Sequence, residues 1–146
     1  MTKTPEPAET AETSAARRRA ETWLADFEAA LAARDADRAA ALFATTSFWR
    51  DLVAFTWNLK TVEGRDGVED LLKETLARTK PSDWRTTEEP TEEEGVTTAW
   101  IAFETEAGRG NGLLRLKDGK AWTLLTTLYE LKGHEEPRFG ARPKGV

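Results

Sequence analysis

Cysteine is absent from this sequence of 146 residues, and histidine and tyrosine occur only once each. Without cysteine the chain forms no disulfide, no thiolate metal site and no cysteine nucleophile. The single histidine, His134, lies in a segment rich in Pro, Gly and charged residues, and no residue near it has the spacing of a metal ligand. The sequence therefore predicts no metal site, no serine-histidine catalysis and no cofactor.

Long apolar runs are also absent, and none approaches the roughly 20 residues that a membrane-spanning helix requires. The first 13 residues are rich in Pro, Glu and Thr and contain no apolar stretch, so they do not have the character of a secretory signal. We expect a cytoplasmic protein without a membrane partner, which agrees with the absence of cysteine. A net charge of −5 disfavours nucleic acid as a partner.

The composition is that of one globular domain, because hydrophobic residues make up 39% and charged residues 32% of the chain. Residues 1–13 are predicted to be a disordered acidic tail. Residues 14–132 form the predicted domain. Residues 133–146 are predicted to be a linker or C-terminal tail, since Pro, Gly and charged residues predominate there.

Two helices are predicted at the start of the domain. Trp23, Phe27 and Leu31 recur at intervals of four residues and form one apolar stripe of a helix over residues 14–33. Asp35 is a typical N-cap residue and indicates a short second helix.

The rest of the chain favours strands, because aromatic and β-branched residues predominate. A third helix interrupts them, beginning near Asp66 in an Asp-x-x-Glu signal and ending before Pro81. Asp118-Gly119 predicts a two-residue hairpin turn, and residues 108–112 (Gly-Arg-Gly-Asn-Gly) are interpreted as another turn. The predicted strands span residues 48–53, 55–59, 84–89, 96–106, 112–117 and 121–131. The element order is therefore α-α-β-β-α-β-β-β-β, an α+β domain whose helices cover one face of a curved sheet.

The segment Phe48-Trp49-Arg50-Asp51, followed by Gly64-Arg65-Asp66-Gly67-Val68 at the start of a helix, resembles the nuclear transport factor 2-like (SnoaL-like) superfamily. The resemblance covers roughly residues 16–131. It implies a cone-shaped domain in which a curved mixed and antiparallel sheet carries three helices on its concave face. Members include ketosteroid isomerases, SnoaL-type cyclases, epoxide hydrolases and dehydratases, and also non-catalytic binding or dimerisation modules.

Three further segments, residues 48–61, 114–127 and 142–146, resemble the N-terminal region of bacterial flavin-containing monooxygenase-like proteins. In that group such a region precedes a dinucleotide-binding domain. The chain contains no strand-linked Gly-x-Gly-x-x-Gly, so no flavin or NADPH site is assigned to its residues. The resemblance implies either an excised N-terminal domain or a stand-alone relative.

Asp51 is the candidate catalytic residue. The resemblance places it at the general-base position of the isomerase branch, where a base needs a low-dielectric pocket and an oxyanion stabiliser. The tyrosine that the isomerases carry on the first helix is missing here, and their second acid corresponds to Gly112. A structural carboxylate, bonded for example to a Trp N–H, is the alternative. An Asp-Arg-Asp arrangement of the epoxide hydrolase type would have to draw on Arg115 and Glu104.

Six tryptophans are many for a chain of this length. Trp49 shares the strand face of Asp51 because side chains alternate along a strand. We expect a hydrophobic pocket that holds a flat hydrophobic small molecule, with packing of the core as the alternative. Its predicted lining residues are Trp49, Asp51, Trp57, Trp100 and Trp122.

The last predicted strand is apolar on both faces, although a half-exposed antiparallel strand normally alternates apolar with polar residues. We therefore expect a homodimer, or contact with a flavoprotein domain. One face carries Trp122, Leu124, Thr126 and Leu128, and the other carries Leu125, Thr127, Tyr129 and Leu131.

Two functions from different classes are consistent with these patterns. The first is a small-molecule-binding or dimerisation module without chemistry of its own, as the N-terminal domain of a flavin-dependent monooxygenase-like protein. The second is a stand-alone isomerase, cyclase or dehydratase that uses Asp51 as general base in a hydrophobic cone.

Overall fold

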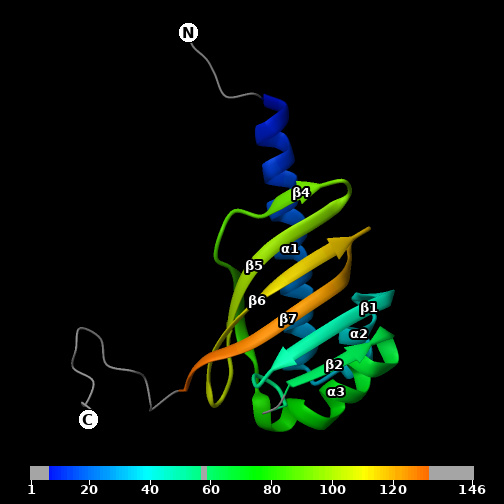
Figure 1. Cartoon of the computed structure of the whole chain (residues 1–146), viewed down its shortest axis with the longest axis vertical. Coiled ribbons are helices and arrows are strands. Elements are labelled where there is room, and N and C mark those ends of the chain that lie inside the picture. Colours follow the sequence, from blue (N-terminus) through cyan, green and yellow to red (C-terminus); the bar gives the residue numbers. More distant parts are fainter. Residues whose placement is uncertain (1–6, 57–58, 132–146) are drawn as a thin grey trace, which may run out of the picture.

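A computed structural model describes residues 7–56 and 59–131 (Figure 1). Within these residues three helices accompany one curved, open sheet of seven strands, which confirms the predicted α+β class. One short strand, β4, was not predicted. The elements are α1 (Pro7–Ala32), α2 (Ala36–Ala40), β1 (Phe43–Leu52), β2 (Leu59–Glu63), α3 (Gly64–Thr79), β3 (Ser82–Thr86), β4 (Thr91–Glu93), β5 (Val96–Glu104), β6 (Gly108–Lys117) and β7 (Lys120–Leu131).

The strands lie in the order β2-β1-β7-β6-β5-β3, and β4 pairs with β5 beside this path. All pairs are antiparallel except β1 with β7, which run parallel. The first and last strands of the chain are therefore neighbours in the middle of the sheet, as Figure 1 shows.

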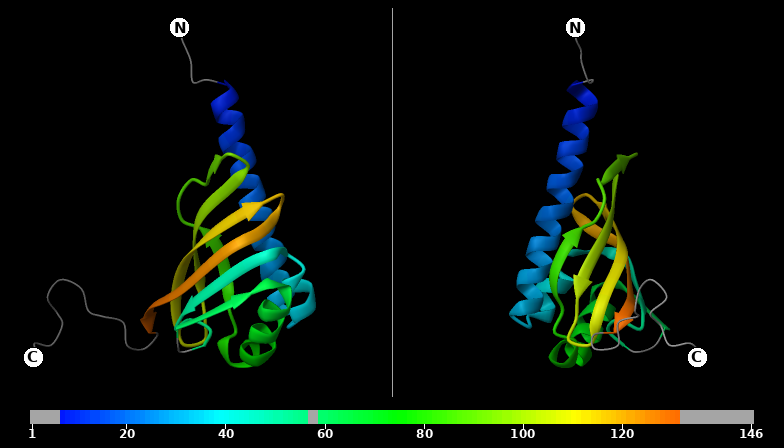
Figure 2. Two further views of the ribbon diagram at one scale, coloured as in Figure 1. Left: turned by 45° about the vertical axis from the view of Figure 1, so that its right-hand side comes forward. Right: turned by 90° about the vertical axis from the view of Figure 1, so that its left-hand side faces the viewer.

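The helices gather on one face of the sheet, as the right-hand view of Figure 2 shows for α1. Helix α1 packs against β3, β4 and β5, and α3 packs against β1 and β2. We call the helix-covered side the inner face and the opposite side the outer face. Along β1 and β6 buried side chains alternate with more exposed ones, so each strand contributes to both faces.

The starts of two helices differ from the sequence prediction. Helix α1 begins at Pro7 rather than near residue 14, and proline is well tolerated in a first helical turn because its missing N–H would have no partner there. Residues 1–6 of the predicted acidic tail and residues 132–146 lie outside the described residues. Helix α3 begins at Gly64, ahead of Asp66, and Glu63 at its N-cap makes no side-chain capping bond. The Asp35 cap of α2 is confirmed, since its side chain accepts a hydrogen bond from Arg38 N at 3.0 Å.

The predicted strand over residues 55–59 is wrong. Strand β1 ends at Leu52, residues 53–56 form a bend and a turn, and β2 begins only at Leu59. The physical reason is that the backbone N–H groups of Phe55 and Thr56 both donate to the carboxylate of Asp51 and are therefore not available to a ladder. Trp57 and Asn58 lie outside the described residues.

The turn predicted over residues 108–112 is also wrong, because these residues begin β6. Gly110 and Gly112 are needed because atoms of the neighbouring strands approach the backbone of β6 closely at these residues. A Cβ on Gly110 would overlap the ring of Phe103, and a Cβ on Gly112 would overlap the carbonyl oxygen of Leu125. The hairpin at Asp118-Gly119 is confirmed, and both residues have positive φ (54° and 76°), as a type I′ turn requires.

Charged residues join α1 to the strands at one end of the sheet. Arg17 forms an ion pair with Glu89, and Arg19 forms one with Glu92. The acidic stretch over residues 88–94 includes β4. Two of its acids are matched by the arginines of α1.

Candidate functional site

Asp51 is fully buried on the inner face near the end of β1. One carboxylate oxygen accepts hydrogen bonds from Phe55 N (2.9 Å), Thr56 N (2.9 Å) and Thr56 Oγ1 (3.0 Å). The other oxygen accepts a hydrogen bond from Thr126 Oγ1 at 2.6 Å. Four donors thus surround one buried carboxylate, the arrangement that makes burial of a charge tolerable.

Thr126 links this carboxylate to the tryptophan beside it. The parallel pairing of β1 with β7 places Asp51 opposite Thr126. Trp49 Nε1 donates to Thr126 Oγ1 at 2.8 Å, so the threonine hydroxyl accepts from the indole and donates to Asp51. Trp49 and Asp51 therefore share the inner face, as alternation along the strand predicted.

The same carboxylate holds a strained turn. Val53, within this turn, has a φ of 77°, which is unfavourable for a β-branched residue. The two backbone bonds from Phe55 and Thr56 to Asp51 close the turn around it. The turn directs the side chain of Phe55 into the core, where it is fully buried. Asp51 therefore acts in this structure as the anchor of the connection that leaves β1.

Aromatic rings fill the interior around Trp49. Its ring centroid lies 4.9 Å from that of Phe55, 5.9 Å from that of Phe43 and 6.1 Å from that of Phe27. Edge-to-face and stacked contacts of this kind stabilise a core beyond the burial of area. These side chains therefore pack directly against Trp49. The full cluster comprises Trp23, Phe27, Phe43, Trp49, Phe55, Trp84 and Phe103.

The residues predicted to line one pocket are divided between the two faces. Trp49 and Asp51 are buried inside, whereas Trp100 is 49% exposed on the outer face. The indole of Trp122 lies on the outer side, with Lys117 Nζ 5.4 Å from its ring centroid. Trp122 occupies a β-bulge, because Arg115 pairs with Thr123 and Leu116 with Ala121, and this extra residue shifts the alternation of β7. Trp57 lies outside the described residues.

Sequence reasoning missed Trp84 as an interior residue. It is buried on β3 and stacks on Phe103 with a centroid distance of 4.4 Å. The alternation in β3, where Trp84 is the only buried side chain between exposed neighbours, is the signal that could have identified it.

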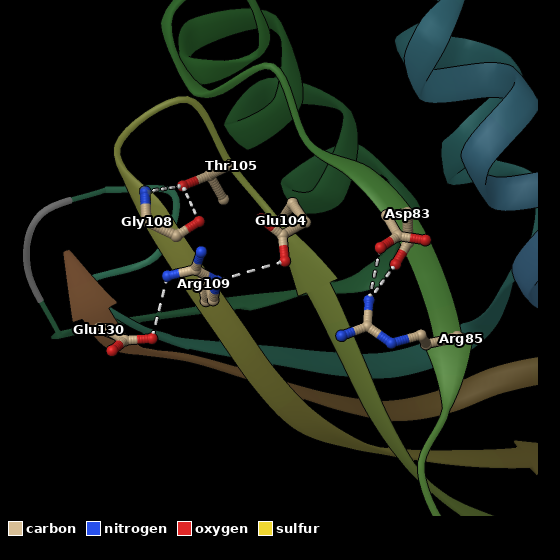
Figure 3. A network of polar contacts seen from close by, with 7 residues as sticks. All are labelled: Asp83, Arg85, Glu104, Thr105, Gly108, Arg109 and Glu130. Carbon is tan, nitrogen blue, oxygen red and sulfur yellow. Dashed lines mark hydrogen bonds and ion pairs between the residues drawn. The ribbon is translucent and has the colours of Figure 1, made fainter. Parts of the chain in front are cut away.

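Tyr129 and the predicted partners Glu104 and Arg115 have surroundings of their own, away from the hydrogen bonds of Asp51. Tyr129, the only tyrosine, is 54% exposed. Glu104 is paired with Arg109 (3.8 Å), which also donates to Glu130 at 3.0 Å, as Figure 3 shows. Arg115 is exposed, and in the strand register it lies opposite Thr98 on β5 and Thr123 on β7. The Asp-Arg-Asp arrangement is therefore not formed.

Residues 7–56 and 59–131 contain no group of three or more His, Asp or Glu side chains that could hold a metal ion. None of the helices described there combines the length and the hydropathy needed to cross a lipid bilayer.

The outer face presents a second candidate site. Its exposed large apolar side chains include Phe48, Leu59, Trp100 and Tyr129. Between two of them, Trp100 and Tyr129, lies an open hollow of about 390 Å³ that Asn111 and Glu88 also line. Arg85 at its edge is neutralised by Asp83 at 2.8 Å (Figure 3). Within the described residues no helix covers these side chains.

Comparison with solved structures identifies the fold. A cystatin-like domain of unknown function from Nostoc punctiforme aligns with a TM-score of 0.62 over 82% of this chain and 78% of that chain, at 14% identity. The fold is that of the cystatin-like and nuclear transport factor 2-like proteins. A nuclear transport factor 2-like protein of unknown function from Cytophaga hutchinsonii aligns with a TM-score of 0.51 over 75% of this chain and 88% of that chain, at 13% identity.

A protein with a ketosteroid isomerase-like fold from Catenulispora acidiphila aligns with a TM-score of 0.54, over 71% of this chain and 82% of that chain, at 15% identity. At such identities the likeness concerns the nuclear transport factor 2-like fold and not an activity. No protein-family model matches the chain, and no curated protein matches it.

Proposed function

We propose that this nuclear transport factor 2-like domain is a non-catalytic association module whose outer face binds a second copy of the chain. The observation that carries the proposal is the row of side chains at the middle of the outer face. Trp100, Leu113 and Leu125 lie side by side on β5, β6 and β7. Trp100 and the nearby Tyr129 are exposed and the two leucines are half-buried, so this part of the outer face presents apolar side chains of the kind that mark a protein interface.

The inner face supports the non-catalytic part of the proposal. A general base needs a free lone pair directed at the substrate proton. Asp51 already accepts four hydrogen bonds, and Phe55 packs beside it against Trp49. Its geometry is that of a structural acceptor.

Sedimentation equilibrium of the full chain tests the association. The wild type is expected to be a dimer at micromolar concentrations, and Leu125→Asp to be a monomer, because a carboxylate would be buried in the centre of the interface. Ala77→Asp on the exposed side of α3 is the matched control and should leave the dimer intact. A monomeric wild type would contradict the proposal.

The resemblance to monooxygenase-like proteins supports a second occupant for the same face, namely a flavoprotein domain on the same polypeptide. The genomic reading frame tests this. A continuation past Val146 into a strand followed by Gly-x-Gly-x-x-Gly would favour the flavoprotein domain. In that case the flavoprotein domain of the same polypeptide, and not a second copy of this domain, would cover the outer face.

A further inference from the structure

On the outer face, side chains of the four adjacent strands β5, β6, β7 and β1 lie opposite one another in rows across the sheet. The central row runs from Trp100 on β5 through Leu113 on β6 and Leu125 on β7 to Arg50 on β1. Neighbouring strands are about 4.8 Å apart, so Trp100 and Arg50 lie at equal distances, about 7 Å, on either side of the line between β6 and β7.

This row is complementary to the same row of a second copy that runs in the opposite direction. A two-fold axis parallel to the strands and lying between β6 and β7 turns the row over and opposes it to itself. Leu113 then faces Leu125 of the second copy, and Trp100 faces Arg50 of the second copy. A two-fold interface repeats every contact, so the row supplies two apolar pairs and two pairs of a guanidinium with an indole.

The two flanking rows obey the same symmetry. One row contains Ala102, Asn111, Thr127 and Leu52, and the other contains Thr98, Arg115, Thr123 and Phe48. Reversal of the first opposes alanine to leucine and asparagine to threonine, so apolar meets apolar and polar meets polar. Reversal of the second opposes Arg115 to Thr123 and Thr98 to Phe48, and no like charges face each other.

The charged groups on this face fit the same arrangement. Within the described residues Arg50 is exposed and forms no ion pair. The hollow beside Trp100 is walled by the second aromatic ring, Tyr129, and by the carboxylate side chain of Glu88, and Arg85 at its edge is paired with Asp83. Two aromatic rings and an acid are a suitable surface for a guanidinium, which stacks on ring faces and pairs with carboxylates.

We infer that two copies of the chain associate about this axis, with Arg50 of each copy seated in the Trp100–Tyr129 hollow of the other. The inference rests on the proposed function and specifies its geometry. Facing sheets pack about 10 Å apart, a separation that an arginine side chain spans. Because the outer face is convex, the central strands β6 and β7 make the closest contact and the axis lies between them.

A charge-exchange experiment on the full chain tests the pairing. Arg50→Glu places a carboxylate against the partner's tryptophan and Glu88, and Trp100→Lys places an ammonium against the partner's Arg50. Each variant alone alters two symmetric contacts, so its dimer dissociation constant should rise at least about 100-fold. An equimolar mixture should regain a dimer of near wild-type affinity. The mixed dimer contains one original pair and one exchanged Lys–Glu pair.

Arg115→Glu is the control, because Arg115 is an exposed arginine of the same face but lies in another row. A mixed dimer of Arg115→Glu with Trp100→Lys keeps one repulsive contact between the introduced ammonium and Arg50, so its affinity should stay well below that of the Arg50→Glu mixture. A dimeric wild type whose two variants fail to complement each other overturns this inference and leaves the proposed function standing. Equal complementation by Arg115→Glu overturns it as well. A monomeric wild type overturns both.

Cross-linking gives an independent measurement if a charged variant is poorly folded. The chain has no cysteine, so single cysteines are uniquely addressable. Thr98→Cys of one copy should face Phe48→Cys of the other. The same residue in the two copies, for example Thr98→Cys in each, would be displaced sideways by three strand spacings, or about 14 Å. A bismaleimide of about 10 Å should therefore join mixed Thr98→Cys and Phe48→Cys chains. Preferential linkage of like chains would refute the axis.

Discussion

Thr126 and Asp51 are joined by a hydrogen bond of 2.6 Å between strands that enter the sheet from opposite ends of the chain. The hydroxyl also receives the indole N–H of Trp49, so one side chain satisfies two buried polar groups. The stability of this region therefore depends on a hydroxyl group at residue 126.

Thr126→Val should lower the free energy of unfolding by about 2–4 kcal/mol, because Asp51 Oδ1 loses the donor at residue 126 and the buried N–H of Trp49 loses its acceptor. Thr126→Ser retains the hydroxyl and loses one methyl group, which costs about 1 kcal/mol. Urea denaturation followed by tryptophan fluorescence distinguishes the two. Equal losses for both variants would show that the hydroxyl does not matter.

Asp51→Asn keeps the shape of the side chain but exchanges an acceptor oxygen for an NH₂ group. We expect a loss of about 1–3 kcal/mol in the free energy of unfolding, since one or more of the four donors then meets another donor. Circular dichroism during thermal denaturation measures the change. A variant as stable as the wild type would contradict the anchoring role and reopen that of a general base.

How far the sequence predicts the structure depends on whether the determining contact is local. The hairpin at Asp118-Gly119 was predictable because the two residues themselves provide the positive φ values. The end of β1 was not, because the Asp51 side chain takes the N–H groups of Phe55 and Thr56 out of any ladder. Residues 108–112 were misinterpreted for a similar reason.

The glycines in that segment respond to atoms of the two neighbouring strands, the ring of Phe103 on β5 and the carbonyl of Leu125 on β7. For the candidate site, alternation correctly placed Trp49 beside Asp51. It failed for Trp122, because the bulge in β7 changes the alternation. No local pattern could indicate which tryptophans face helices and which face the uncovered side, since the whole sheet has to be assembled first.

Gly112→Ala should prevent folding into this structure, because the added Cβ would overlap the backbone carbonyl of Leu125 and backbone atoms in the middle of a sheet cannot move aside. Gly119→Ala is the comparison. No atom lies within 4 Å of its Cβ, and only the positive φ is unfavourable, at a cost of about 1–2 kcal/mol. Soluble yield and thermal denaturation report both effects. Similar behaviour of the two variants would be inconsistent with the described packing.

Removal of the arginines that contact the acidic strands should have a small, salt-dependent effect. Arg17→Ala with Arg19→Ala is expected to lower the free energy of unfolding by about 1 kcal/mol or less, because both ion pairs are solvent-exposed. The difference from the wild type should shrink in about 1 M salt. Arg18→Ala serves as control, since Arg18 forms no ion pair within the described residues. An equal loss for Arg18→Ala would mean that helix propensity, and not pairing, is responsible.

The parallel contact between β1 and β7 also determines when this protein can fold. Asp51 and Thr126 are 75 residues apart, so the buried carboxylate has no fourth donor until residue 126 has left the ribosome. Until then the aromatic side chains of the first half have no last strand to pack against. Such non-local closure slows folding and exposes apolar surface to aggregation. A chain cut before residue 126 should therefore be a substrate for chaperones and proteases instead of a smaller stable domain.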